Sequence, residues 1–324
     1  MGEVMLALIP GTMVVSYFLG PGVLINLTLS VLVAIACEAV VLRLRKRDIF
    51  STISDGSIVL AAWLLALCLP PSLPISQLVF GAITLTILGK HVYGGLGQNP
   101  FNPAMVAYAV LLISFPKSMT LWFDTEAALS LSAYGPDSWS AWWQLKWRVG
   151  FPGAPWDSIT QATPLDQLRT LNHQNLAVNA IQSTQLDTSS LSTTPWFEIS
   201  FAWLLGGLYL LARGIIRWHI PIAMLVAAAL FHVVHSYFFS VPSPPTWSAL
   251  LYGGVIFGAF FIATDPVTAP SSTRARLCYG AGIGVLTMAL RSSSNYPEGV
   301  AFAVLLMNAA TPLFDRMFTL EARS

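Results

Sequence analysis

The residues best suited to carry a covalently attached group lie in one polar stretch, residues 157–163, whose sequence is DSITQAT. The stretch combines an acid, Asp157, with two threonines, Thr160 and Thr163, in a chain that is otherwise strongly apolar. A threonine hydroxyl that faces water outside a membrane is a candidate attachment point for a cofactor. The same Thr163 is also a typical helix start, because a proline and then an acid follow it. On spacing alone, the N-cap is the commoner use of such a threonine.

A second group of residues with chemical potential is the turn at residues 94–103, GGLGQNPFNP. It is not a dinucleotide-binding fingerprint, because the third glycine of that motif is missing and no strand precedes it. The glycines allow close approach of the backbone to a ligand, and Asn99 and Asn102 offer paired amide donors and acceptors. These groups suit the polar edge of a flavin ring. The alternative is a Gly/Pro turn whose asparagines cap helix ends.

Two carboxylates lie in or beside apolar stretches, where a charge is costly unless it is paired. Glu38 is about one turn inside an apolar run, and Asp265 ends another, in the turn ATDPVT at residues 263–268. Pairing with neighbouring arginines explains both, and a place for Glu38 in an ion path is the alternative reading. The arginines near in sequence are Arg43 and Arg45 for Glu38, and Arg274 and Arg276 for Asp265.

No metal site is expected. His232 and His235 are three residues apart, and two histidines alone make a poor site. The three cysteines lie far apart in apolar runs, outside any CxxC or Cys/His cluster, so they are expected to be buried small apolar side chains. They are Cys37, Cys68 and Cys278.

The composition places the chain in a membrane. Of its 324 residues 55% are hydrophobic and 10% are charged, and the mean hydropathy is +0.66. A soluble domain carries about 25% charged residues, so the chain is expected to be an integral membrane protein. The formal net charge is +1, and no basic cluster is interleaved with aromatics, so no nucleic-acid partner is expected.

Apolar runs bounded by charges or by Pro and Gly predict an all-α fold with about ten transmembrane segments. Several runs are shorter than the about 20 residues that cross a bilayer, as expected of broken helices that line an enclosed cavity. The first five runs are 4–19, 22–42, 57–69, 75–91 and 102–116, and the second five are 196–212, 219–239, 247–263, 275–290 and 297–314.

The two halves repeat each other. Residues 103–112, PAMVAYAVLL, and residues 297–306, PEGVAFAVLL, share seven of ten identities, and both begin the last segment of their half. Because five segments are an odd number, the second half starts on the opposite side of the membrane, which makes the repeat inverted. In the ninth run, Gly280 and Gly284 are four residues apart, a spacing typical of close helix packing.

The positive-inside rule orients this layout. With both termini in the cytoplasm, eleven of the sixteen Lys and Arg residues fall inside and five outside. The chain then divides into a first membrane repeat at 1–116, a long periplasmic loop at 117–195 that carries Thr163, and a second membrane repeat at 196–324. In the loop, residues 139–147 (WSAWWQLKW) could form an interfacial helix that anchors the loop.

Taken together, these motifs resemble the D subunit of the Rnf complex, a membrane-bound electron-transport complex that couples ferredoxin and NAD redox chemistry to ion movement. The resemblance covers nearly the whole chain, and it rests on residues 94–104, 157–165, 264–268 and 296–306. The related B subunit of the sodium-pumping NADH:quinone reductase shares the fold.

The resemblance implies that Thr163 carries FMN through a phosphoester to its hydroxyl, attached by a periplasmic flavin transferase. Asp157, Thr160 and Ala162 complete the recognition sequence. Ser158 and Gln161 differ from the residues often found at those positions, which is expected to reduce recognition at worst. A helix N-terminus at this point would suit the phosphate, because free backbone N–H groups and the helix dipole favour an anion.

By the same resemblance, the turn with Asn99 and Asn102 is a candidate site for a second, non-covalent riboflavin. The implied function is that of a flavin-bearing electron-relay subunit in a bacterial inner membrane, an ion-translocating oxidoreductase subunit without a complete active site of its own. Its partners would be the other subunits of the complex, the flavin transferase and the lipid bilayer. The alternatives are the B subunit of the sodium pump and a cofactor-free channel or transporter of inverted-repeat type.

Overall fold

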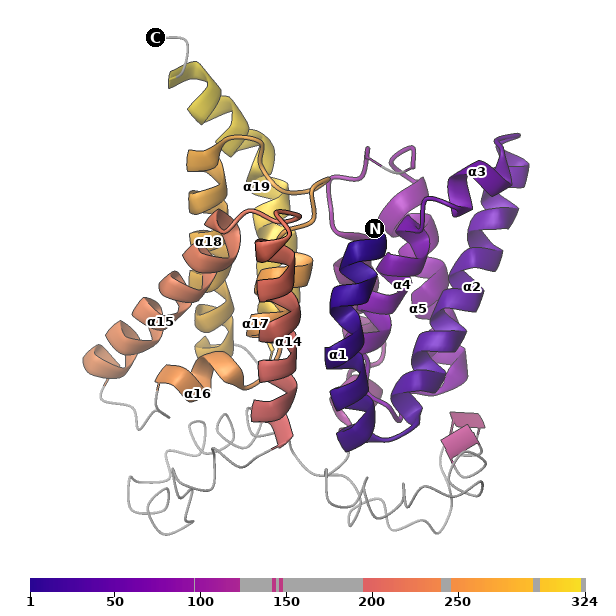
Figure 1. Ribbon diagram of the computed structural model, residues 1–324, viewed down its shortest axis with the longest axis horizontal. Coiled ribbons are helices and arrows are strands. Elements are labelled where there is room, and N and C mark those ends of the chain that lie inside the picture. Colours follow the sequence, from indigo (N-terminus) through magenta and orange to yellow (C-terminus); the bar gives the residue numbers. More distant parts are fainter. Residues whose placement is uncertain are drawn as a thin grey trace. The chain divides into compact units, whose positions relative to one another are not determined.

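The computed structural model describes residues 1–95, 97–122, 142–143, 146–147, 195–239, 246–293 and 298–321. The chain divides into two compact units, Met1–Ala162 and Thr163–Ser324. In Figure 1 the first unit runs from indigo to magenta and the second from red to yellow. The regular elements of the described residues are all helices, as the sequence predicts.

The first unit is a bundle of α-helices in which one helix ends in a π-helical turn. Its elements are α1 (Gly2–Leu19), α2 (Gly22–Leu44), α3 (Ile49–Ile53), α4 (Ser57–Cys68), α5 (Ile75–Thr84), η1 (Leu85–His91), α6 (Pro103–Ser114) and α7 (Pro116–Thr120). The five expected apolar runs are all helical here. The short helices α3 and α7 were not expected.

Prolines and an asparagine set the helix ends in this unit. α4 stops before Pro70 and Pro71, which cannot continue a helix, and α5 starts after Pro74. α5 passes without a break into η1, which ends at Lys90 and His91. α6 starts with Pro103 at its first helical position and the side chain of Asn102 as its N-cap.

The two ends of the first unit can be distinguished by their hydrogen bonds. At one end the segment after α2 meets the turn after η1, since Arg45 donates to His91 O and Arg47 to Gly94 O. At the other end the connection after α4 meets the start of α2 and the segment after α7. There Asn26 donates to Pro70 O, and Ser72 to Leu121 O. The helices α2, α4, α5–η1 and α6 therefore alternate in direction.

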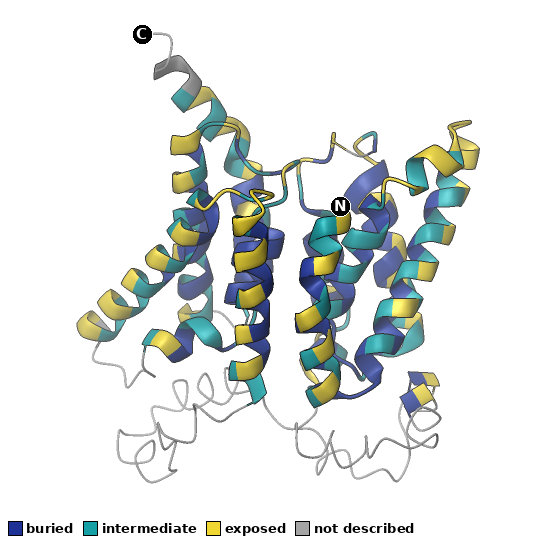
Figure 2. Cartoon of the chain, viewed as in Figure 1, coloured by how far each residue is buried: buried dark blue, intermediate teal, exposed yellow. Residues whose placement is uncertain are grey.

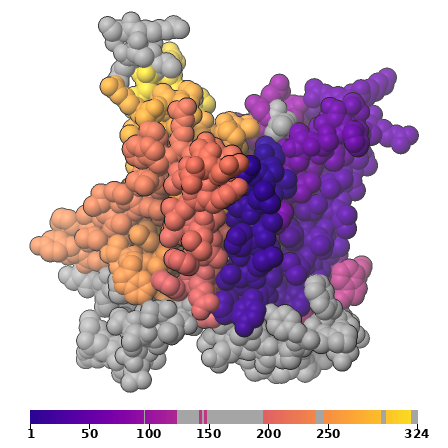
Figure 3. Space-filling view, viewed as in Figure 1, coloured from indigo at the N-terminus to yellow at the C-terminus, as the bar shows by residue number. Residues whose placement is uncertain are grey.

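The second unit has longer helices and one that is interrupted. Its elements are α14 (Pro195–Ala212), α15 (His219–Phe239), α16 (Thr246–Leu251), α17 (Val255–Phe257), η2 (Gly258–Ile262), α18 (Thr273–Ser293) and α19 (Val300–Glu321). The expected run 247–263 is thus a helix broken at Tyr252–Gly254 that ends in a π-helical turn. Figure 3 shows the far end of α15 as the outermost point of this unit, at the left of the view.

α18 packs closely on α15 at Gly280 and Gly284, which confirms the predicted role of these two glycines in helix packing. A Cβ at Gly280 would lie 2.5 Å from Ile220 O, and one at Gly284 would overlap Met224 O. Both obstacles are backbone atoms, which cannot move aside as a flexible side chain can. Glycine is therefore required at both positions for this helix contact.

The second unit also has two distinct ends. At one end Thr311 donates to Thr268 O and Ser271 to Asp315, which joins the connection after η2 to α19. At the other end Arg291 donates to Ala249 O, and Ser200 to Leu251 O. In each unit most of the described basic side chains lie at one end, and the exceptions at the opposite ends are Lys117 and Lys146 in the first unit and Arg291 in the second. In the first unit the basic end carries Arg43, Arg45, Lys46, Arg47 and Lys90, and in the second Arg213, Arg217, Arg274, Arg276 and Arg316.

The chain is an all-α, multi-pass membrane protein. Five helices, α1, α2, α14, α15 and α19, are long and apolar enough to cross a bilayer. Figure 2 shows exposed residues in yellow along α1, α2, α14 and α15, and many of the exposed side chains on these helices are large and apolar. Examples are Leu32 on α2 and Leu230 on α15. Crossing by all ten runs, the inverted relation of the repeats and the periplasmic loop stay predictions.

One expectation about the cysteines is wrong. Cys37 and Cys68 are half-buried and Cys278 is exposed, so none is a fully buried core residue. The reason is that an apolar run in a membrane protein has a lipid-facing side, and a small apolar thiol is as acceptable there as in the core.

Candidate functional site

The residues expected to hold covalent FMN lie outside the described residues. These are Asp157, Thr160, Ala162 and Thr163. Of the long loop the structure describes Lys117–Trp122 and four residues, 142–143 and 146–147. The prediction of a covalent flavin site therefore rests on the sequence alone.

The glycine turn after η1 has a backbone that only glycine adopts readily. Gly94, Gly95 and Gly97 have φ of 116°, 117° and 84°. A Cβ at Gly97 would meet nothing within 4 Å, and one at Gly95 only Arg47 Nη1 at 3.7 Å. The turn is therefore open beside Gly95 and Gly97, where a flat ligand can approach the backbone, whereas Gly94 is covered by the side chain of Gln98.

The two asparagines of this turn are both buried, but they differ in their contacts. Asn102 Oδ1 accepts from Ala104 N at 3.0 Å and Met105 N at 3.2 Å, so it caps α6. Asn99 Nδ2 donates to Phe101 O at 3.0 Å, which tightens the turn. The capping role that the sequence offered as an alternative is confirmed for Asn102. Its carbonyl oxygen is thereby committed to the helix, whereas Asn99 has no helix to cap.

These features fit a planar polar ring in part. The open glycine face supplies backbone approach, and Asn99 supplies a buried amide beside it. Asn102 fits better as the residue that fixes the turn than as a ring contact.

A buried ion pair between Glu38 and Lys90 lies directly before the turn. The sequence did not predict Lys90 as the partner of Glu38. Lys90 Nζ on η1 lies 2.5 Å from Glu38 Oε1 on α2 and donates to Ser57 Oγ at 2.9 Å. Glu38 is 0% and Lys90 3% exposed. His91 Nε2 lies 3.4 Å from the same carboxylate oxygen. Pairing of Glu38 was expected, but with Arg43 or Arg45; Arg45 instead binds the carbonyl of His91.

The cluster around Glu38 is not fully satisfied. Glu38 Oε2 and both ring nitrogens of His91 are buried and have no hydrogen-bond partner in the described part of the chain. Ionisable groups buried inside a membrane bundle are costly and mark ion or proton paths more often than structural sites. π-helical turns such as η1 also occur frequently at functional sites. Because Gly95 N donates to Lys90 O, the cluster and the glycine turn form one continuous segment.

The second unit has its own polar cluster beside η2. Tyr279 Oη on α18 donates to Asn308 Oδ1 on α19 at 2.5 Å, and both side chains are buried. Asp265 follows η2, and its Oδ1 accepts from Val267 N at 3.2 Å. Burial raises the pKa of the Asp265 carboxyl. Thr268 lies beside Asp265 and Tyr279. The buried Asn308 Nδ2 has no hydrogen-bond partner among the residues that the structure describes.

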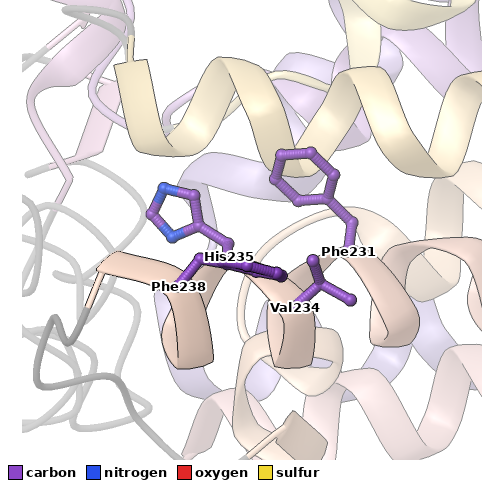
Figure 4. Close-up of a pocket in the computed structure, with 4 residues that line it drawn as sticks. All are labelled: Phe231, Val234, His235 and Phe238. Atoms are coloured by element: carbon purple, nitrogen blue, oxygen red, sulfur yellow. The ribbon is translucent and has the colours of Figure 1, made fainter.

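His235 does not belong to a metal centre in the described part of the chain. Its ring stacks on Phe231 with centroids 5.9 Å apart, and the two line a shallow apolar hollow with Val234 and Phe238 on α15 (Figure 4). Among the described residues no group of three or more His, Cys, Asp or Glu side chains could hold a metal ion. The ring of His235 therefore packs among apolar side chains of its own helix, and its place at the membrane surface stays a prediction.

Fold and site together define a class of protein. It is a helical, multi-pass membrane protein with buried ionisable side chains and glycine-rich turns where its helices are interrupted. The chain belongs to the NQR2, RnfD, RnfE family, which it matches over residues 1–322.

Three relatives are named as the D subunit of an ion-translocating oxidoreductase complex. Those of Escherichia fergusonii and Vibrio cholerae are 42% identical to this chain, and that of Escherichia coli is 41% identical. Each comparison covers 96% of this chain and 90% of the relative.

Proposed function

We propose that this chain is the D subunit of an ion-translocating oxidoreductase complex of the Rnf type, located in a bacterial inner membrane. The observation that carries the proposal is similarity over nearly the full length to proteins of that name. Five helices capable of crossing a bilayer agree with a membrane subunit. The other membrane and peripheral subunits are its partners, because this chain has no cysteine cluster or dinucleotide motif of its own.

The redox role of the chain is to hold flavin. FMN joined through its phosphate to the Thr163 hydroxyl would relay electrons, and the flavin supplies the redox chemistry while the protein fixes its position and potential. Asp157, Thr160 and Ala162 would serve recognition by a periplasmic flavin transferase. The support is the sequence DSITQAT in the long polar loop, which the positive-inside rule predicts to lie outside the cytoplasm.

A second, non-covalent flavin would bind at the glycine turn. Asn99 is the side chain proposed to contact the ring edge, and Asn102 the one that holds the turn through its cap on α6. The open space beside Gly97 supports this placement.

The part of the chain proposed to act in ion movement is the cluster of Glu38, Lys90 and His91. Its support is the burial of an ion pair together with carboxylate and imidazole atoms that lack partners. A cofactor-free channel or transporter is the competing function, and it has no use for a modification sequence at residues 157–163.

Isolation of the intact complex from its native membrane tests the proposed function. The expected result is co-purification with ferredoxin- and NAD-reactive subunits, and a band of this chain that fluoresces as flavin on a denaturing gel. Co-purification with the subunits of a sodium-pumping quinone reductase would favour the sister family instead. A chain isolated alone and free of flavin would favour the channel.

A further inference from the structure

The long loop contains a lysine in an unusual environment at one end of the first unit. Lys146 is 1% exposed, and its Nζ donates to Asn26 Oδ1 at 2.5 Å and to Leu73 O at 3.2 Å. Asn26 is itself fully buried and donates to Pro70 O at 3.0 Å. One amine thus connects the loop to the first turns of α2 and to the connection after α4.

Trp142, one helical turn before Lys146, strengthens this contact. Its ring is 3% exposed and packs on Gly22 so tightly that a Cβ there would lie 2.7 Å from the indole. On the opposite face Trp143 and Trp147 are exposed, with ring centroids 6.0 Å apart. Residues 142 and 146 therefore form the docked face of this short segment.

No negative charge offsets the buried amine within the described part of this end. The elements that meet there are the end of α1, the start of α2, the connection after α4, and α7. Their titratable side chains are Tyr17 and Lys117, both exposed. Among the described residues the acceptors of Lys146 Nζ are two neutral oxygens, which compensate poorly for the loss of water around an ammonium group.

We propose that Lys146 and Trp142 form a clasp that docks the loop on this end of the first unit, and that protonation of the Lys146 amine loosens it. Three observations bear on this contact: the two acceptors that Lys146 Nζ occupies, the close packing of Trp142 on Gly22, and the lack of a counter-charge among the described residues of this end. The clasp rests on the proposed function in one respect only, namely that the loop it holds also carries the flavin.

The direction of the pH effect follows from burial. Burial lowers the pKa of Lys146 to about 7, whereas an undocked lysine keeps the ordinary value near 10.5. Below pH 7 both forms carry the proton, and docking does not depend on pH. Above pH 7 only the docked amine loses its proton, so docking strengthens as pH rises. One such proton changes the docking equilibrium about tenfold between pH 6 and pH 8.

The test is hydrogen–deuterium exchange of the intact complex at pH 6 and pH 8, corrected for the intrinsic exchange rates. The wild type should protect the amides of residues 142–147 about tenfold more at pH 8. Lys146→Met, which keeps the side-chain length without the amine, should give equal protection at both values. Lys117→Met, at the exposed lysine of the same end, should behave as the wild type.

A second variant separates protonation from simple packing. Asn26→Asp places a carboxylate beside the Lys146 amine, which favours the protonated form of the docked lysine. Protection of the amides of residues 142–147 at pH 6 should therefore rise to at least the wild-type level at pH 8. Equal wild-type protection at both pH values, or a pH dependence that survives in Lys146→Met, would overturn the proposal. The readout does not use flavin, so an unmodified Thr163 leaves this result unaffected.

Discussion

The glycine turn shows how two identical side chains three residues apart can take different roles. Asn102 accepts from two backbone N–H groups of α6, while Asn99 is buried and donates to Phe101 O within the turn. A ligand at this turn should therefore depend on Asn99 for contact and on Asn102 for the shape of the site.

Substitution of the two asparagines should separate these roles. Asn99→Leu should lower non-covalent flavin while the covalent flavin stays, because the ring edge loses an amide partner. Asn102→Ser keeps a capping oxygen and should retain most flavin, whereas Asn102→Leu removes the cap at a cost of about 0.5–2 kcal/mol. The measurement is acid-extracted flavin per mole of complex. Unchanged extracted flavin in the double variant Asn99→Leu, Asn102→Leu would leave the turn with a purely structural role.

The Glu38–Lys90 pair allows a test that distinguishes stability from ion movement. Glu38→Gln leaves Lys90 buried without a counter-charge and should destabilise the first unit by roughly 3–5 kcal/mol. The double variant Glu38→Gln, Lys90→Met should recover much of that stability. Thermal unfolding in detergent gives both values.

Ion transport by the same double variant, reconstituted in proteoliposomes, decides the functional question. Loss of transport with retained flavin reduction is expected if the pair lies in the ion path. Transport at the wild-type rate in this stable variant would mean that the pair is structural.

At the scale of elements, the apolar runs predict the helices well because burial in a membrane is encoded locally. All ten runs are helical, and the Pro and Gly residues at their borders explain where α4 stops and α6 begins. The break at Tyr252–Gly254 and the π-helical turns were not predicted. They depend on contacts made elsewhere, such as Glu298 Oε2, which accepts from Gly254 N at 2.7 Å across 44 residues.

The candidate site was less predictable for the same reason. The sequence offered Arg43 and Arg45 as partners of Glu38, but its partner Lys90 is 52 residues away. From the sequence, Lys146 was predicted only to be one of the five basic residues outside the cytoplasm. In the structure its partner is Asn26, which is 120 residues away. Pairings of this kind follow from the packing of helices, which local spacing does not record.

Helix packing in the second unit gives a prediction with a matched control. Gly284→Ala should lower the melting temperature, because its Cβ would overlap the backbone of Met224 on α15. Gly282→Ala, on the same helix, meets only the flexible end of Met307 and should cost less. Both changes add one methyl group, so helix propensity cancels in the comparison. Equal melting temperatures for the two variants would show that α15 and α18 are not closely packed here.

At the scale of the whole molecule, the separation of charge in each unit predicts the orientation in the membrane. The basic end of the first unit includes α3, and the opposite end includes α7. The positive-inside rule then puts α3 in the cytoplasm and α7 outside.

Single cysteines in a background without Cys37, Cys68 and Cys278 test this orientation. A membrane-impermeant thiol reagent should label Thr120→Cys in intact cells, and Ser51→Cys only after the membrane is opened. Both positions are exposed, so a difference in labelling between them must come from the side of the membrane on which each lies. Labelling with the opposite pattern would place the basic end outside and exclude a periplasmic flavin loop.

The central claim is that Thr163 carries FMN, and mass spectrometry of the peptide that contains it tests this most directly. From cells that hold the flavin transferase, the wild-type peptide should carry an FMN adduct and the chain should fluoresce on a denaturing gel. Thr163→Ala should abolish both, Thr163→Ser should keep at least part, and Thr170→Ala in the same loop should keep all. The fold should survive each change, because loss of an N-cap costs about 0.5–2 kcal/mol. A wild-type peptide of unmodified mass would contradict the account.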